Sequence, residues 1–197
     1  MIDYLKGIVT ELDPTHAVIE CGGVGYDCAI SVFTYDKLRV GTEQKLWIAE
    51  SIREDAHLLY GFISKQERQC FLLLVTVSGV GPNTARLILS SLAPDELVAV
   101  ISSGNDRQLK NVKGIGGKTA QRIIVDLRDK IGSTGIAAAS ASESPLLASN
   151  ENADEAVSAL VALGYPQANA SKAVAQLLSK DPSASVQALI KQALHML

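Results

Sequence analysis

The sequence predicts an α+β protein of several domains: an N-terminal β-barrel, a central all-α domain, a flexible linker and a C-terminal three-helix bundle. Three observations lead to this prediction. Apolar residues of the first 63 positions follow the two-residue period of strands, and later ones follow a helical period. A Gly-x-Gly segment recurs 35 residues further along the chain. A stretch rich in Ser and Ala then precedes the last 47 residues.

Residues 1–63 contain five strand-like segments and a short helical piece near 33–38. The segments are 4–12, 16–21, 26–31, 45–52 and 57–62, with turn residues at Gly22-Gly23-Val24-Gly25 and at Arg53-Glu54-Asp55. Five short strands in this length are typical of a small Greek-key barrel of the OB type, a common platform for oligonucleotides. A five-stranded barrel without a nucleic-acid partner remains the alternative for this segment.

Residues 64–132 are predicted to be helical. The expected helices are 65–76, 82–92, 94–102, 106–111 and 117–131. Ser64, with Glu67 three residues later, predicts a capping box at the first helix. Its apolar run 71–75 covers almost every side of the helix, which predicts a central position in the domain.

The repeated segment carries the functional prediction. Ser78-Gly79-Val80-Gly81-Pro82-Asn83-Thr84-Ala85 corresponds to Lys113-Gly114-Ile115-Gly116-Gly117-Lys118-Thr119-Ala120. Glycine permits φ > 0 and lets another surface approach the backbone closely. A helix that begins at such a bend presents unpaired N–H groups at the positive end of its dipole. Two such bends in register predict tandem helix-hairpin-helix motifs that bind phosphate through the main chain without reading bases.

The predicted DNA-contacting residues lie on both bends. They are Gly79, Val80, Gly81, Asn83 and Thr84 in the first, and Gly114, Ile115, Gly116, Gly117, Lys118, Thr119 and Arg122 in the second. The β-branched Val80 and Ile115 are expected to be buried between the flanking helices. Gly-Gly-Lys-Thr at 116–119 also suggests a nucleotide-binding P-loop, but Val112 stands where that motif needs its first glycine. A further alternative is that the glycines only form turns between helices.

Charge is distributed unevenly along the chain. The net charge is −3, yet residues 1–63 hold five basic against ten acidic residues, and residues 64–132 hold ten against six. The positive surplus therefore coincides with the repeated bends, where a nucleic-acid partner is predicted.

Three cysteines without metal-ligand spacing indicate reduced thiols and no metal site. No cofactor is expected. The N-terminus shows no signal-peptide pattern, and the longest wholly apolar run, Phe71–Val75, is too short to cross a membrane. A cytoplasmic location is predicted.

Residues 133–150 are predicted to be a flexible linker, and residues 151–197 three short amphipathic helices. The first of these helices is expected to end at Gly164-Tyr165-Pro166. A small helical domain on a tether is typical of a partner-docking module. A bundle packed against the rest of the chain is the alternative.

Five motifs in this order resemble the RuvA family of Holliday-junction-binding subunits, and the resemblance covers the whole chain. The motifs are Gly22-Gly23-Val24-Gly25-Tyr26, Arg53-Glu54-Asp55-Ala56 followed by Leu58-Leu59-Tyr60-Gly61-Phe62, Gly79-Val80-Gly81-Pro82, Gly114-Ile115-Gly116, and Ala162-Leu163-Gly164-Tyr165.

The resemblance implies a non-catalytic protein of DNA recombination and repair that holds a four-way junction open in a square-planar form. It implies a homotetramer, with an octamer on DNA as a further form, and a hexameric ATPase of the RuvB type as partner. A resolvase of the RuvC type is a further partner of the family. A UBA-like C-terminal bundle would dock the ATPase through Leu160, Leu163 and Tyr165. Glu54 and Asp55 match the family's acidic pin, whose carboxylates would repel phosphates at the crossover and weaken binding of plain duplex.

The sequence departs from the family pattern at two positions. Asn83 and Gly117 stand where lysines are usual, which removes positive charge from the predicted DNA face. Two rival functions differ in class. A helix-hairpin-helix glycosylase or nuclease needs a base-flipping pocket or a carboxylate cluster, and Asp126 is the only acid within 121–128. A single-strand binder of the OB type needs exposed aromatic residues, and the nine aromatic residues here are mostly expected in the core.

Overall fold

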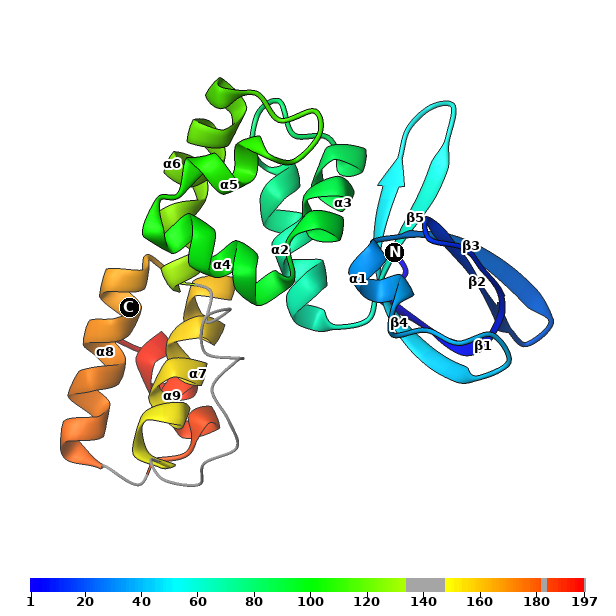
Figure 1. Ribbon diagram of the computed structural model, residues 1–197. Helices are drawn as coiled ribbons and strands as arrows, with labels where there is room; N and C mark the ends of the chain where they lie inside the picture. Colours follow the sequence, from blue (N-terminus) through cyan, green and yellow to red (C-terminus); the bar gives the residue numbers. More distant parts are fainter. Residues whose placement is uncertain (134–147, 182–183, 197) are drawn as a thin grey trace. The chain divides into compact units, whose positions relative to one another are not determined.

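The computed structural model describes residues 1–133, 148–181 and 184–196 (Figure 1). The chain divides into two compact units between residues 142 and 143. The first unit contains a β-barrel and the helices that carry the two glycine bends, and the second contains the C-terminal helices. None of the described helices is both long and apolar enough to span a lipid bilayer.

The N-terminal part of the first unit is a closed five-stranded barrel. Its elements are β1 (Tyr4–Leu12), β2 (His16–Cys21), β3 (Val24–Ile30), α1 (Val32–Tyr35), β4 (Glu43–Ile52) and β5 (His57–Phe62). The strand order is β1-β2-β3-β5-β4, with β3 and β5 parallel, and pairing of β1 with β4 closes the barrel. This is the OB-type barrel that the strand spacing predicts. β3 begins two residues earlier than expected, because Gly22 and Gly23 alone form the preceding turn with φ of 60° and 84°.

Two of the three cysteines lie in hydrophobic cores. Cys28 faces the barrel interior and Cys70 lies in the helical core, exposed by 0% and 2% respectively. Burial raises the pKa of each thiol to about 12, so neither forms a thiolate at neutral pH. Cys21 is only half-buried.

A thiol-specific alkylating reagent at pH 8 is therefore expected to modify Cys21 in the native protein and to leave Cys28 and Cys70 unmodified. All three should react in denaturant. Mass spectrometry of the intact protein would count the added groups, and rapid native modification of two or three thiols would contradict the described burial.

The helical part of the first unit comprises α2 (Lys65–Val75), α3 (Pro82–Ser91), α4 (Pro94–Ser103), α5 (Asp106–Lys110) and α6 (Gly117–Ser133). α2 packs against β4, β5, α3, α4 and α6, which confirms its predicted central position. It also joins the helices to the barrel: the ring of Phe71 lies 5.0 Å from that of Tyr60 and 4.9 Å from that of Phe62. Strands β4 and β5 therefore contribute Ala49, Tyr60 and Phe62 to the hydrophobic core of the helices, while the barrel interior forms a second core.

Glu67 adds a buried polar link between these two parts. The Ser64 hydroxyl accepts a hydrogen bond from the Glu67 amide at 3.1 Å, as the capping box predicts. The second half of that prediction is wrong, because the Glu67 carboxylate turns instead to the barrel. It accepts hydrogen bonds from the hydroxyls of Ser31 and Thr34 and from the Ile63 amide. Burial raises the pKa of Glu67 against the opposing effect of these three donors.

The second unit is formed by α7 (Ala148–Ala162), α8 (Gln167–Lys180) and α9 (Val186–Leu194) around a small apolar core. α7 is followed by Gly164 with φ of 99°, whose amide bonds to the carbonyl of Val161, as the Gly-Tyr-Pro signal predicts. The predicted linker lies mostly outside the described residues. Its ends differ from the prediction: α6 runs through Ser133 and α7 begins at Ala148.

Candidate nucleic-acid interface

The first bend joins α2 to α3. Gly79 has φ of 90°, a conformation that favours glycine. Val80 is 5% exposed, which confirms its predicted burial, and its amide bonds to the Val77 carbonyl at 3.0 Å. The first helical hydrogen bond runs from Ala85 to Gly81. The amides of Gly81, Asn83 and Thr84 consequently have no acceptor among the described residues.

The second bend, between α5 and α6, repeats this geometry. Gly114 has φ of 89°, Ile115 is 6% exposed, and its amide bonds to Val112 at 3.1 Å. The first helical bond runs from Ala120 to Gly116, which leaves the amides at positions 116–119 without an acceptor in the part of the chain that the structure describes. The P-loop alternative is wrong, because the segment before this bend is the helix α5 and not a strand.

Both bends are open to solvent at their second glycine. A Cβ atom added to Gly81 or to Gly116 would meet nothing within 4 Å. The side chains of Val80 and Ile115 point inward, so these two predicted contact residues offer only main-chain atoms to a ligand. The turns-only alternative does not require this open face, whereas a surface that admits a phosphate does.

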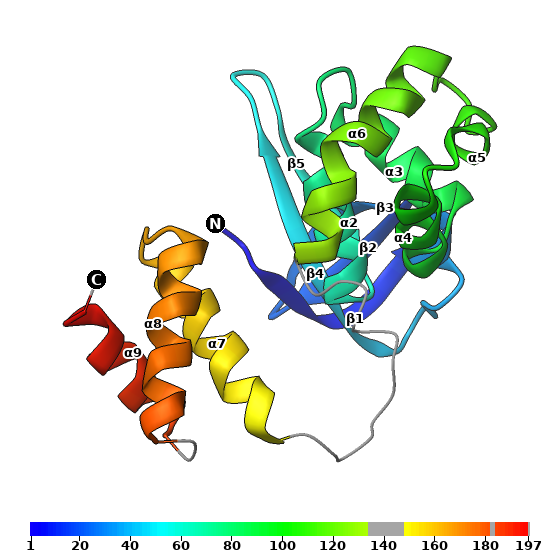
Figure 2. The same cartoon turned by 90° about the vertical axis from the view of Figure 1, so that its left-hand side faces the viewer.

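Arg122 connects the two bends. It belongs to α6, which follows the second bend, and its Nη1 donates to the carbonyl of Ser78 at 3.4 Å, next to the first. Figures 1 and 2 show the α2–α3 and α5–α6 loops at the same end of the first unit. The unpaired amides of both bends and the exposed Lys118 therefore lie on one surface.

Substitution of Arg122 by Ala is expected to weaken DNA binding by a similar factor for every sequence, because a group that touches phosphate positions the duplex and does not read it. Affinities for several duplex arms of different sequence, measured at one salt concentration, test this. A loss confined to one sequence would indicate base reading instead.

Glu54 and Asp55, the predicted acidic pin, lie at the tip of the β4–β5 hairpin. The Arg53 amide bonds to the Ala56 carbonyl at 2.8 Å and closes the turn, with Glu54 and Asp55 at its exposed centre. Neither carboxylate has an ion pair within 4.0 Å among the described residues. Figure 2 places this tip at the end of the unit where the two glycine bends lie.

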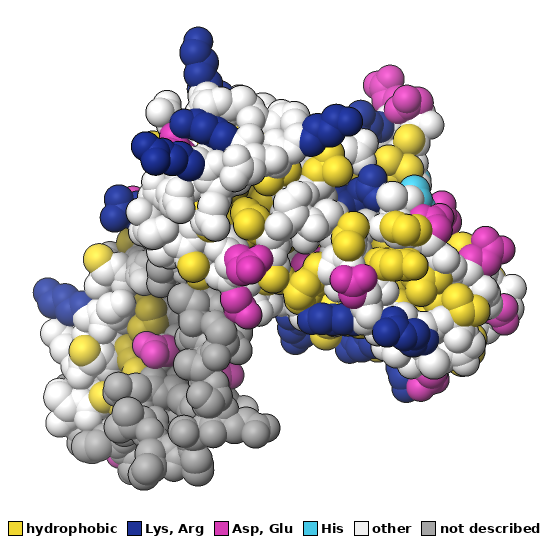
Figure 3. Space-filling model, viewed as in Figure 1, with side chains coloured by type: hydrophobic (Ala, Val, Ile, Leu, Met, Phe, Trp, Pro, Cys, Tyr) yellow, Lys and Arg dark blue, Asp and Glu magenta, His cyan; other side chains and the backbone are white. Residues whose placement is uncertain are grey.

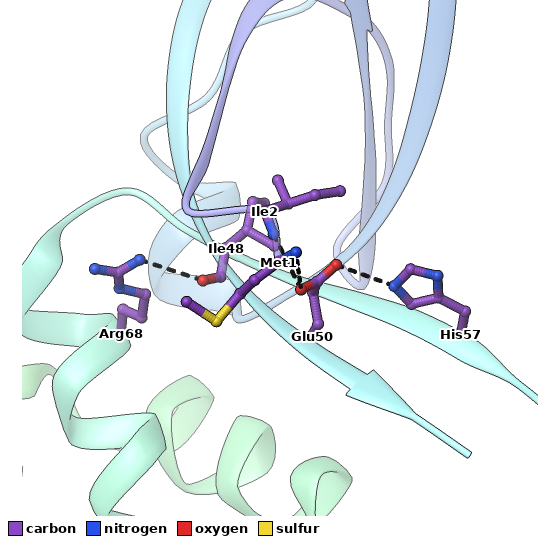
Figure 4. Close-up of polar contacts among 6 residues, drawn as sticks. All are labelled: Met1, Ile2, Ile48, Glu50, His57 and Arg68. Atoms are coloured by element: carbon purple, nitrogen blue, oxygen red, sulfur yellow. Dashed lines mark hydrogen bonds and ion pairs between the residues drawn. The ribbon is translucent and has the colours of Figure 1, made fainter.

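The base of the hairpin is held more firmly than its tip. Glu50 on β4 accepts a hydrogen bond from the Ile2 amide at 3.0 Å, and its other oxygen lies 3.2 Å from Nε2 of His57 on β5 (Figure 4). The N-terminal amine lies 3.8 Å from the same carboxylate. The Ile2 N–H and then His57 hold the pKa of Glu50 below its usual range. These contacts anchor both strands where the β4–β5 hairpin leaves the barrel.

Basic side chains gather over the loop end of the helices, and acidic side chains occupy the hairpin tip (Figure 3). Asn83, which stands where a lysine is usual, adds no positive charge to this surface. Its amide oxygen accepts a hydrogen bond from the Tyr60 hydroxyl of β5 at 3.4 Å. Most of the aromatic residues lie in or against a hydrophobic core, as expected: Tyr60, Phe62 and Phe71 are buried, and Tyr26, Tyr35, Trp47 and Tyr165 are partly buried against the cores. Tyr4 is 49% exposed, with the Lys45 ammonium 3.9 Å from its ring centre.

The predicted docking residues of the C-terminal unit separate into two kinds. Leu160 is 0% exposed within the bundle core, so its assignment as a direct partner contact is wrong. It lies on the inward face of α7 and packs inside the bundle. Leu163, the first residue after α7, is 61% exposed, and Tyr165 is half-buried.

An OB-type barrel packed against helices that carry two equivalent helix-hairpin-helix bends defines the class: a tandem helix-hairpin-helix protein built on an OB-type platform. Comparisons with known proteins agree with this class. Residues 1–61 match the RuvA N-terminal domain, residues 71–129 a SAM-like helix-hairpin-helix tandem, and residues 151–197 the RuvA C-terminal domain.

Relatives similar over the full length of both chains include proteins of Bacteroides thetaiotaomicron, Porphyromonas gingivalis and Flavobacterium psychrophilum. They are 54%, 51% and 42% identical, and each is named Holliday junction branch migration complex subunit RuvA. The chain belongs to the RuvA family.

Proposed function

We propose that this protein binds four-way DNA junctions, holds them open in a square-planar form and recruits a RuvB-type ATPase that drives branch migration in recombination and repair. One observation supports this most strongly: two equivalent bends with unpaired amides lie at the same end of one unit as an unpaired acidic hairpin tip. The names of its relatives describe a subunit of such a complex.

The two features divide the work. The bends grip duplex arms through phosphate oxygens, so binding is independent of sequence. The carboxylates of Glu54 and Asp55 repel phosphates at the crossover, where the arms separate, and penalise a continuous duplex laid across the same surface. The protein itself is a non-catalytic subunit that needs no cofactor, and the ATPase performs the chemistry.

The assembly completes the proposal. Residues 1–63 form the core of a homotetramer, residues 64–132 bind the arms, and two tetramers can enclose one junction as an octamer. The domain 151–197, tethered by residues 133–150, docks the RuvB-type hexamer through Leu163 and Tyr165. A RuvC-type resolvase can share the junction, and the complex works in the cytoplasm, where bacterial chromosomal DNA lies.

A comparison of four-way junction, linear duplex and single strand in gel-shift experiments tests this function. The protein should prefer the junction strongly. Four protomers with two bends each give about eight phosphate contacts. The logarithm of the binding constant plotted against log [salt] should then have a slope of about −7. Because two usual lysines are missing, a shallower slope of about −4 to −6 is expected. A slope near zero, or equal affinity for all three DNAs, would contradict the proposal.

A further inference from the structure

Lys110 lies beside position 117, one of the two positions where a lysine is usual in this family but absent here. Position 117, where a lysine is expected in this family, is a glycine in the first turn of α6. A Cβ atom added there would meet Cε of Lys110 at 3.4 Å and its Nζ at 4.0 Å. Lys110 is the last residue of α5, so a different helix brings an ammonium group beside the vacant side-chain position.

Contacts within the first unit hold that ammonium in place. Its Nζ lies 2.6 Å from a carboxylate oxygen of Asp106, one turn earlier on α5. The Lys110 ammonium, and to a smaller extent the side chain of Gln121 on α6, lower the pKa of Asp106. The Lys110 side chain remains 39% exposed. An ammonium has three donors, so two remain for a ligand beside the unpaired amides at positions 116–119.

A basic side chain from another helix also reaches the first bend. Asn83 there is engaged by Tyr60, while the guanidinium of Arg122 reaches the bend from α6. Each bend is therefore approached by a basic side chain from an element outside its own turn: Arg122 at the first and Lys110 at the second.

We propose that Lys110 contacts a backbone phosphate at the second bend and takes the place of the lysine missing at position 117. The inference rests on the proposed function, since the phosphate belongs to a junction arm. Asp106 holds the ammonium over the bend and at the same time partly neutralises it. The two residues therefore have opposite effects on DNA affinity, whereas a pair that only stabilised the fold would lose affinity on substitution of either residue.

Four variants of the full-length protein test this: Lys110→Gln, Asp106→Asn, and Lys110→Gln combined with Gly117→Lys or with Gly117→Ala. Arg128→Gln, which removes the same charge further along α6, is the matched control. The dissociation constant for a synthetic four-way junction is measured from 0.05 to about 0.3 M salt, with thermal unfolding of each variant.

Lys110→Gln should weaken binding about tenfold at 0.1 M salt for each Lys110 engaged and make the salt slope shallower by about 1 per contact. Asp106→Asn should tighten binding and steepen the slope, although it breaks the same ion pair. In the Lys110→Gln variant, the second substitution Gly117→Lys should restore the junction affinity of the unsubstituted protein. The second substitution Gly117→Ala should not restore it.

Different results would separate two failures. If the unsubstituted protein binds the junction but Lys110→Gln behaves like Arg128→Gln, this inference is wrong and the proposed function stands. If Asp106→Asn weakens binding as Lys110→Gln does, the pair acts only through structure and the inference is again overturned. If the unsubstituted protein shows no preference for the junction, both the inference and the proposed function fail.

Discussion

Replacement of Gly81 and Gly116 together by alanine should reduce junction affinity at least about 100-fold while the melting temperature stays within about 2 °C. Gly81 has φ of −84°, and an added Cβ at either position meets nothing within 4 Å, so the fold accepts alanine. The new methyl groups stand on the open face of each bend. A charge-assisted hydrogen bond from an amide to phosphate contributes about 1.5–3 kcal/mol, hence about tenfold or more in affinity per bend lost.

Gly79 and Gly114 provide the matched comparison, because each is the first glycine of its bend. Their φ values of 90° and 89° lie outside the range that alanine adopts readily. Alanine there should cost about 1–2 kcal/mol of folding free energy at each site and lower the melting temperature. Thermal unfolding and junction titration of both double variants therefore separate strain from steric exclusion. Unchanged junction binding by the Gly81→Ala, Gly116→Ala variant would refute main-chain contact at the bends.

Neutralising the pin should raise DNA affinity, whereas the alanine substitutions at the bends should lower it. Glu54→Gln with Asp55→Asn is expected to raise affinity for linear duplex about tenfold, because two exposed carboxylates no longer repel a continuous phosphate backbone. Junction affinity should change less, since the arms diverge at the crossover. The preference for the junction over duplex should therefore fall.

The control for this variant is Glu11→Gln with Asp36→Asn, which removes two exposed charges elsewhere on the barrel. It corrects for the change in net charge, and it should raise duplex affinity by less than the pin variant does. Parallel titrations with duplex and junction at one salt concentration measure both effects. A fall in duplex affinity on neutralising the pin would show that these carboxylates support binding and do not oppose it.

Local patterns in the sequence predicted most of the fold. Strand alternation and the Gly22-Gly23 and Arg53–Asp55 turns defined the barrel, and the 35-residue offset of the glycines defined the two equivalent bends. Burial of Val80 and Ile115 also followed from the sequence. Each is an apolar, β-branched residue in the turn between two helices, and the core between those helices is the apolar surface within its reach. These features depend on neighbours within a few residues, which sequence spacing reports directly.

Contacts between distant segments could not be predicted in this way. The capping-box pattern at Ser64 and Glu67 says nothing of Ser31 and Thr34, which meet the same carboxylate only after the barrel docks on α2. The approach of Lys110 to Gly117 likewise depends on the angle between α5 and α6. For Leu160, the helical period marked an apolar face but not whether a partner or the bundle itself covers that face.

The central claim is that unpaired backbone amides at the two glycine bends bind phosphate. Hydrogen–deuterium exchange of peptides covering residues 78–85 and 113–120, with and without a four-way junction, measures this most directly. In the free protein, the amides at 81, 83, 84 and 116–119 have no acceptor among the described residues, so they should exchange fast. Junction binding should slow exchange in both peptides and leave the pin turn at 53–56 unchanged. Exchange that stays fast at both bends while the protein is saturated with junction would contradict the claim.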